Sequence, residues 1–428
     1  MNQRPFAAAL GSTIHARLRG TFRSLHAYNY RIWAVGTTVS NIGTWMQRIA
    51  QDWLVLTQLT HHSGFAVGVI MSLQFGPPIL LMSLAGAAAD RLDRRRLLMV
   101  TQAALGATAM LLGILVLSGV VTLWQVDVLA GITGCVSAFD APARQTIIAE
   151  LVGDADLPNA VALNSILFNG AQLIGPALAG LMIAAIGTGW VFVLNGLSFG
   201  AVLVSLLRMR TADFKPVLRA SGPDRGLGFT LRYVWHRREL VIALAMLFLV
   251  GTYGLNFPIF ISTMSVTTFH GGANVYGALS SAMAVGSVLG ALATAGRRLP
   301  SLRVLAFSAL AFGVIGLMAA AMHSVWWFGL MLAVLGAAAQ TFTTSTNSLV
   351  QLSTDPAMRG RVMAIYMGIF LGCTPLGAPL MGWIADVLGP RWALATGAAS
   401  GLAAALLAAI YFRRSQTVRQ AVEPSQLQ

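Results

Sequence analysis

Apolar runs long enough to cross a bilayer follow one another along almost the whole chain. Each holds about 20 residues, the length that a helix needs to cross a hydrocarbon core of about 30 Å. They occupy residues 32–59, 64–88, 97–119, 123–138, 163–186, 190–207, 241–264, 273–295, 301–322, 326–349, 362–388 and 392–412. A bilayer core offers no water to unpaired backbone groups, so spans of this kind are helical. The sequence therefore predicts an all-α integral membrane protein with about twelve transmembrane helices.

Composition leaves no room for a second, soluble domain. Hydrophobic residues make up 56% of the 428 residues and charged residues only 10%, against about 25% charged in soluble domains. The net charge of +14 is spread over short loops between spans, so we expect no nucleic-acid partner. Cys135 and Cys373 both fall inside predicted spans, which indicates neither a disulfide framework nor a metal site.

The basic residues are distributed very unevenly between the two sides of the membrane. Counting by alternate loops, 26 of the 28 lie on the side of the two termini, and the exceptions are Arg48 and Arg391. Because Lys and Arg accumulate in cytoplasmic loops, both termini and the central loop are predicted to be cytoplasmic. The N-terminal segment is basic and lacks an apolar core with a cleavage site, so we read it as a tail rather than a signal peptide. The expected location is the cytoplasmic (inner) membrane of a bacterium.

One sizeable polar insertion divides the spans six and six. We predict a cytoplasmic basic tail (1–30), an N-terminal six-helix half (31–208), a cytoplasmic linker (209–239), a C-terminal six-helix half (240–412) and a second cytoplasmic tail (413–428). The latter part of the linker has the pattern of a short amphipathic helix at the membrane surface, which we interpret as an interfacial anchor.

A repeat supports this division. Gly175-Pro-Ala-Leu-Ala-Gly180 recurs as Gly377-Ala-Pro-Leu-Met-Gly382, an offset of 202 residues. Gly187-Thr-Gly-Trp recurs at the same offset as Gly389-Pro-Arg-Trp. Two six-helix halves in the same orientation are the parallel repeats of one large transporter class, with the substrate path at their interface.

The loop after the second span carries a recognisable motif. It resembles the signature that the major facilitator superfamily has between its second and third helices, and the matching residues are Gly86, Asp90, Arg91, Arg94 and Arg95. Asp93 stands where the signature usually has a second Gly. A positive-inside loop alone would explain the arginines but not Gly86 and Asp90 at this spacing.

This resemblance implies a cytoplasmic gate. Asp90 would cap a helix of the other half, while Arg94 or Arg95 would pair with an acid at the end of the fourth span. We expect that acid to be Asp140.

Strings around Trp45-Met-Gln-Arg48 and around Asp140-Ala-Pro-Ala-Arg144 are similar to one branch of that superfamily, the enterobactin exporter-like transmembrane secretion effectors. The similarity implies export of a small molecule from the cytoplasm, typically driven by protons. In the fifth span, Gly175, Pro176 and Gly180 resemble the superfamily's antiporter motif. The alternative is that Gly and Pro are simply common in membrane helices.

The first span contains two charges, Arg48 and Asp52, one helical turn apart on one face. A charge at mid-membrane costs about 2.5–3.5 kcal/mol, so such residues usually face a hydrated cavity or the protein interior. Asp127 lies at a similar depth in the fourth span. The resemblance to the major facilitator superfamily implies that the first and fourth helices both line the central cavity, so the three residues are expected to form one network. We take Asp52 as the first candidate proton carrier, Asp127 as the second and Arg48 as the modulating charge. The alternative is a static ion pair that fixes helix packing.

Polar residues elsewhere in the spans are candidates for contact with the substrate. They are Gln47, Gln51, Asn169, Gln172, Asn256, Gln340, Thr344 and Asn347, with Phe257, Phe260, Trp326 and Trp327 as aromatic lining. Such a lining suits a large, mostly apolar or aromatic solute. The aromatic residues at span ends have an alternative role as interfacial anchors.

The expected function is export by a secondary active transporter that uses alternating access and proton antiport. An importer or uniporter of the same fold is the alternative, and a transport-inactive receptor a more distant one. We expect no enzymatic activity, because the sequence has no His-Glu-x-x-His motif and no phosphate-binding loop. We expect no cofactor and no metal, only a small-molecule substrate, protons and the lipid bilayer as partners, and a monomer.

Overall fold

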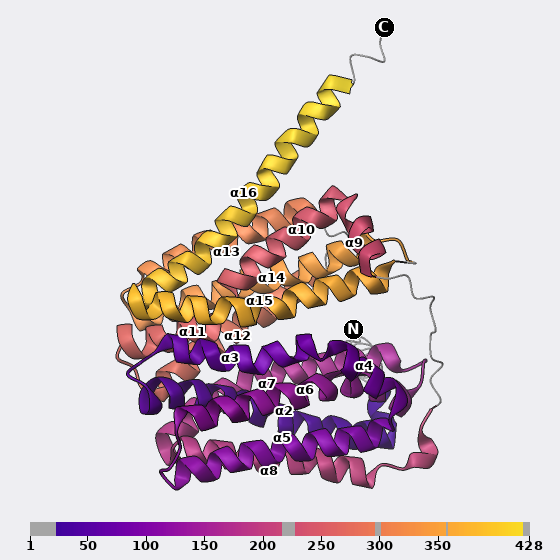
Figure 1. Ribbon diagram of the computed structural model, residues 1–428, viewed down its shortest axis with the longest axis vertical. Coiled ribbons are helices and arrows are strands. Elements are labelled where there is room, and N and C mark those ends of the chain that lie inside the picture. The colour runs from indigo at the N-terminus through magenta and orange to yellow at the C-terminus, as the bar shows by residue number, and fades with distance from the viewer. Residues whose placement is uncertain (1–22, 216–226, 296–300, 357, 423–428) are drawn as a thin grey trace, which may run out of the picture.

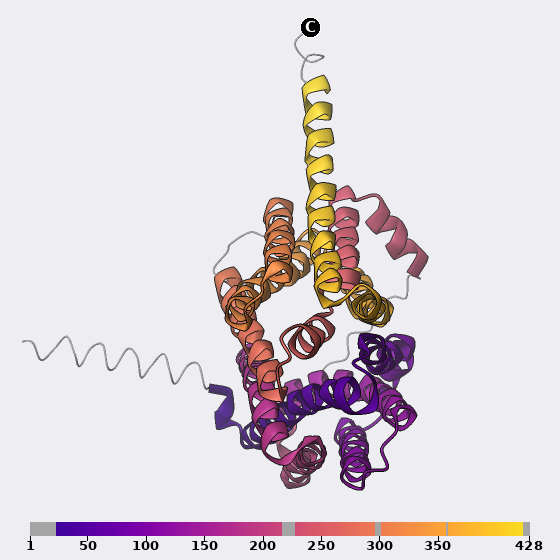
Figure 2. The ribbon, with the colours of Figure 1, turned by 90° about the vertical axis from the view of Figure 1, so that its left-hand side faces the viewer.

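The computed structural model describes residues 23–215, 227–295, 301–356 and 358–422, and these residues form helices and no strands (Figure 1). The N-terminal half consists of α2 (Tyr28–Leu54), α3 (Gly64–Leu80), α4 (Met82–Arg91), α5 (Arg94–Leu117), α6 (Leu123–Val152), α7 (Leu157–Ile186) and α8 (Thr188–Arg208). The C-terminal half consists of α10 (Arg238–Leu249), α11 (Phe257–Thr263), α12 (Ala273–Ala295), α13 (Leu302–Ala321), α14 (Val325–Leu352), α15 (Arg359–Val387) and α16 (Pro390–Val422). Viewed along the helices, most of the C-terminal half lies above the N-terminal half, and α11 and α12 reach down against it (Figure 2).

These elements account for the twelve predicted spans. By length and hydropathy, ten of the described helices can cross a membrane, counting Arg238–Thr268 as one, and an eleventh results if α3 and α4 form a single span bent by 57°. Pro77 and Pro78 lie just before that bend, where they remove backbone donors and loosen the helix. The first helix, α2, is too polar to be counted, although its 27 residues reach about 40 Å. Its polar residues are tolerated because much of the helix is enclosed by the bundle, with Asn29, Ser40 and Gln51 buried.

The repeat marks equivalent positions in the two halves. Gly187 and Gly389 each precede the last helix of their half with a positive φ, 86° and 99°, which glycine adopts without a Cβ clash. A Cβ on Gly180 of α7 would lie 2.7 Å from the carbonyl oxygen of Ala273, and one on Gly382 of α15 would overlap the carbonyl oxygen of Gly64. The fifth long helix of each half therefore passes close to the backbone of the other half, which confirms the two parallel six-helix repeats.

The two halves meet along two seams. In the first seam α3 packs on α15, and in the second α7 packs on α12. One end of the bundle carries the linker, α4 and α9, and we call it the linker end; we call the opposite end, at the left of Figure 1, the far end. The contacts of both seams lie toward the far end. There, a Cβ on Gly68 would overlap the backbone of Ala378, and one on Gly277 would lie 2.5 Å from the Pro176 carbonyl oxygen.

Toward the linker end, no hydrogen bond between the halves occurs among the described residues; those that do occur lie at the far end and near the middle of the helices. Glycines on this part of α4, α7 and α15 have open space where a Cβ would stand, with no neighbouring atom within 4 Å: Gly86, Gly170, Gly360 and Gly368. The structure is thus a form in which the halves are joined at the far end and apart at the linker end.

The linker contains α9 (Leu227–Trp235), the predicted amphipathic helix. Directly after it, Arg237 forms an ion pair with Asp355 (2.8 Å), which attaches the linker to the loop between α14 and α15. Residues 216–226 of the linker and 1–22 of the N-terminal tail lie outside the described residues. The last helix continues to Val422, beyond the predicted end of the span at 412, and projects from the bundle (Figure 1).

Candidate functional site

Asp52 of α2 lies in a closed contact between the two halves. Its Oδ2 accepts a hydrogen bond of 2.8 Å from the Tyr276 hydroxyl of α12. Asp52 is only 8% exposed and Tyr276 is fully buried. The expectation that Asp52 faces a hydrated path is wrong for this conformation, because Tyr276 of the other half covers the carboxylate.

Arg48 lies one turn closer to the linker end and is half-buried. Its guanidinium carbon is 4.6 Å from the centre of the Trp45 ring and 5.4 Å from that of Phe75. The ion pairs within 4.0 Å among the described residues join other arginines to acids, and none includes Arg48. Arg48 and Asp52 therefore lie near each other, as expected, but do not form a direct ion pair, since the carboxylate accepts its hydrogen bond from Tyr276 instead.

Asp127 stands apart from these two residues. It is half-buried in the second turn of α6, and its Oδ1 is buried with no hydrogen-bond partner. No hydrogen bond or ion pair among the described residues connects it to Arg48 or Asp52. The predicted three-residue network is therefore wrong for this conformation.

Two glutamines of α2 bond within their own half. Gln47 accepts a hydrogen bond of 2.6 Å from Asn195 of α8, and Gln51 accepts one of 3.1 Å from Gln74 of α3. The amides thus surround the charged turn of α2 and hold its neighbours in place.

The other substrate candidates differ widely in environment. Asn169 is exposed on the linker-end half of α7 and Gln172 is half-buried one turn further on. On α14, Gln340 donates to Thr344 (3.1 Å), and Asn347 is half-buried. Asn256 is fully buried and donates to the Thr252 carbonyl, so it stabilises the first span of the second half and does not line a path in this form.

The predicted aromatic lining is wrong in this form. Phe257 packs edge-on against Phe260 and Phe312, inside the second half. Trp326 and Trp327 are 86% and 61% exposed at the first turn of α14, a place typical of interfacial anchors.

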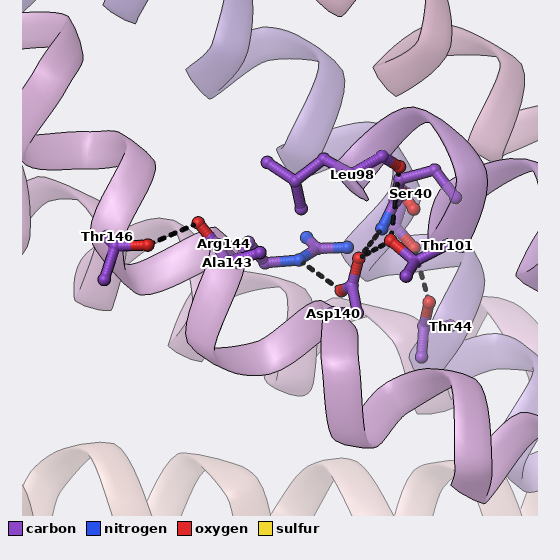
Figure 3. Close-up of polar contacts among 9 residues, drawn as sticks. Ser40, Thr44, Leu98, Thr101, Asp140, Ala143, Arg144 and Thr146 are labelled. Carbon is purple, nitrogen blue, oxygen red and sulfur yellow. Dashed lines mark hydrogen bonds and ion pairs between the residues drawn. The ribbon is translucent and has the colours of Figure 1, made fainter. Parts of the chain in front are cut away.

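The gate motif pairs with a different acid from the one expected. Arg94, at the start of α5, forms an ion pair with Glu150, near the end of α6. Asp140 instead accepts hydrogen bonds of 2.7 Å from Thr101 and from Gln102, and pairs with Arg144 at 2.9 Å (Figure 3). The predicted pairing of Asp140 with Arg94 or Arg95 is wrong because α6 continues to Val152. Asp140 therefore lies about 15 Å further from the linker end than Glu150.

Arg95 and Asp93 of the motif cap helices of their own half, whereas Asp90 does not. Arg95 donates to the carbonyl groups of Leu206 (2.7 Å) and Leu207 (3.2 Å) at the end of α8, where helix carbonyls lack partners. Asp93 is the N-cap of α5 and accepts from the Arg96 amide at 2.7 Å. Asp90, at the end of α4, is exposed and makes no contact with the other half in the described residues. Its predicted capping role is absent here, because the halves are apart at this end.

A Gly-x-Ser-x-Gly pattern at Gly196–Gly200 is not a hydrolase site. It lies inside the uninterrupted helix α8, and Ser198 donates its hydroxyl to the Asn195 carbonyl at 2.7 Å. A hydrolase nucleophile of this pattern needs a sharp strand-to-helix turn.

The sequence profile of the transmembrane secretion effector family matches residues 19–427. The chain belongs to this family. It is 29% identical to the multidrug efflux pump Tap of Mycolicibacterium fortuitum, over 80% of this chain and 85% of the pump. It is 24% identical both to the staphyloferrin A transporter of Staphylococcus aureus (81% and 87% covered) and to the enterobactin exporter EntS of Citrobacter koseri (78% and 80%).

Solved structures confirm the fold. The nucleoside transporter NupG superposes with a TM-score of 0.70 at 12% identity, over 90% of this chain and 99% of that one. A bacterial homolog of the lysosomal transporter Spinster, in an inward-facing and unoccupied conformation, superposes with a TM-score of 0.65 at 15% identity, over 90% and 95%. This transmembrane secretion effector is thus a multi-pass major facilitator transporter, a class of proteins that are not enzymes.

In this secretion effector, Gly175 and Gly180 provide the close helix approach expected of an antiporter-like motif. A Cβ on Gly175 would lie 2.5 Å from the Trp45 Cβ, so α7 packs tightly on α2. The Pro176 carbonyl faces Gly277 of α12. The antiporter role itself stays a prediction.

We expect Gly180→Leu to lower transport strongly. A side chain there meets the backbone of Ala273 and Asn274, which cannot move aside as a flexible side chain can. Overpacking of this kind destabilises a packed interface by about 1–3 kcal/mol. Here it destabilises only the form whose far end is closed, because the two helices are in contact only in that form. Substrate flux in proteoliposomes measures the effect. Gly170→Leu, on the same helix but with open space around it, is the matched control and should retain activity.

The contact of Asp386 with the other half is not apparent from the sequence. Asp386 lies at the far end of α15, and its carboxylate accepts hydrogen bonds from the Ser63 hydroxyl (2.8 Å), the Gly64 amide (2.5 Å) and the Phe65 amide (3.0 Å). A residue of one half thereby caps the N-terminus of α3 in the other half. Ser63 before an apolar run does signal a helix start, but nothing in the sequence indicates that its partner comes from α15.

Proposed function

We propose that this protein exports a small amphipathic, drug- or siderophore-like molecule from the cytoplasm of a bacterium by alternating access, driven by proton antiport. The observation that carries the proposal is the asymmetry of the interface. Both seams are closed at the far end and open toward the linker end. A transporter that alternates between two such forms exposes its centre to one side at a time.

The distribution of basic residues and the names of the relatives support export as the direction of transport. The linker end bears nearly all the basic residues, so it is the cytoplasmic end of the inner-membrane protein. The form with an open linker end then loads its solute from the cytoplasm. The relatives bear names of a multidrug efflux pump, an enterobactin exporter and a staphyloferrin A transporter, which supports a small-molecule cargo.

Asp52 is the group best placed to link proton movement to this exchange. Its bond to Tyr276 joins α2 to α12, so opening the far end breaks that bond and presents the carboxylate to the outside. A carboxylate in apolar surroundings with an arginine one turn away can take up a proton there and release it inside. Asp127 remains a secondary candidate for proton transfer, because it forms no hydrogen bond or ion pair with Asp52 or Arg48 among the described residues.

Everted membrane vesicles test this function. Vesicles from cells that make the protein receive an imposed pH gradient, acidic inside, and the accumulation of siderophore-type catecholates is the readout. Accumulation that depends on the gradient supports export with proton antiport. Loss of preloaded substrate down the same gradient would indicate an importer, and gradient-independent equilibration a uniporter.

A further inference from the structure

Arg48 is a cation within the membrane bundle that forms no ion pair within 4.0 Å, because its acidic neighbour Asp52 is bonded to Tyr276. No acidic oxygen lies within 4.0 Å of Arg48, and no hydrogen bond to it occurs among the described residues. An unpaired charge at membrane depth is costly and normally pairs with another group. Resting on the proposed function, we propose that Arg48 binds an anionic group of the transported molecule, which is therefore an organic anion with an apolar or aromatic body.

The surroundings of Arg48 hold the cation without neutralising it. Trp45 and Phe75 contribute ring faces at 4.6 and 5.4 Å, and Phe168 of α7 packs edge-on against Trp45, with ring centres 5.9 Å apart. Two helices, α2 and α3, thus supply aromatic rings to the guanidinium, and Phe168 of α7 supports the Trp45 ring. Ring faces attract a cation but accept few of its five N–H groups, so the site still lacks a hydrogen-bond acceptor.

Neighbouring amides do not fill this gap. Gln47 is bonded to Asn195, and Gln51 to Gln74, so their oxygens are engaged. The planar guanidinium fits a carboxylate or a catecholate, which can accept two parallel hydrogen bonds. The aromatic rings beside it suit an apolar or aromatic body on the same solute.

Asp52 provides the means of release. In the present form its carboxylate is held by Tyr276, so it is not bonded to Arg48, which is only partly buried. When the far end opens, Tyr276 moves away with the other half, and Asp52 lies one turn from Arg48 on the same helix face. The freed carboxylate then competes with the bound anion, so binding is favoured on the linker side and release on the far side.

Binding of a matched pair of probes tests this inference apart from transport. 2-Naphthoate and 2-naphthamide have the same shape, and only the first is an anion at neutral pH. Titrations of the full chain in nanodiscs, followed by calorimetry or by quenching of tryptophan fluorescence, compare their affinities. We expect 2-naphthoate to bind about tenfold more tightly, as a charge-assisted hydrogen bond predicts.

Three variants assign the preference to Arg48. Arg48→Gln should abolish the difference between the two probes, Arg48→Lys should retain part of it, and Arg391→Gln, in the first turn of α16 at the far end, should leave it unchanged. Size-exclusion profiles check that each variant folds. Equal affinity of the wild type for both probes, binding of neither, or an undiminished preference in Arg48→Gln would overturn the inference. An anion preference in a protein without gradient-driven efflux would instead contradict the proposed function and leave this inference standing.

Discussion

Asp52→Asn is expected to abolish proton-driven efflux while the protein still folds and inserts. The asparagine side chain has the same shape, and its carbonyl oxygen can still accept the hydrogen bond that Tyr276 donates to Asp52 at 2.8 Å. The closed far end should therefore form as before. Asparagine cannot take up a proton, however, so the pH gradient can no longer drive the exchange between the two forms. Proteoliposomes with an imposed pH gradient should show efflux at the level of protein-free vesicles.

Exchange of labelled for unlabelled substrate separates a lost proton step from a broken protein. This exchange needs the conformational cycle but no net proton movement, so the Asn variant should retain it. Asp154→Asn, an exposed acid between α6 and α7, is the matched control and should transport normally. Wild-type gradient-driven efflux by Asp52→Asn would show that the carboxylate is a static packing element and that protons, if coupled, move elsewhere.

The sequence predicts the fold well because membrane spans follow from local composition. A run of about 20 apolar residues has few alternatives to a helix in a bilayer, and the 202-residue repeat relates the halves without any knowledge of contacts. The errors lie where a helix continues past its apolar part. The fourth predicted span ends at 138, whereas α6 runs to Val152, because the polar turns beyond Asp140 are covered by their own half. Because the predicted span ended too early, Asp140 was expected to pair with Arg94, whereas the actual partner of Arg94 is Glu150.

The site was less accessible to prediction, because sequence spacing reveals neighbours on one helix but not across the interface. Arg48 and Asp52 were correctly placed one turn apart, yet the actual partner of Asp52 is Tyr276, 224 residues away. The same holds for Asp386 and Gly64, 322 residues apart. Both contacts depend on how far the two halves have rotated, a property that no local pattern records.

Asp386→Ala is expected to shift the protein toward the form with an open far end. The substitution removes three hydrogen bonds to a charged acceptor and the cap of α3 in one step. A bond to a charged group is worth about 1.5–3 kcal/mol when buried, but Asp386 is exposed and water replaces part of the loss. A net change of about 1–2 kcal/mol is expected, which corresponds to roughly a 5–30-fold change in the ratio of the two forms.

Spin labels placed across the interface measure this shift. With Cys135 and Cys373 replaced, labels at positions 61 and 388 report on the far end by double electron–electron resonance, and labels at 96 and 352 report on the linker end. In Asp386→Ala the far-end distances should lengthen as the linker-end distances shorten, while Asp154→Ala should leave both unchanged. Because the three hydrogen bonds of Asp386 form only when the far end is closed, the variant should also transport more slowly than the wild type. Unchanged distance distributions would mean that the glycine contacts of the two seams are sufficient to close the far end without Asp386. The cap on α3 would then only order the loop before this helix.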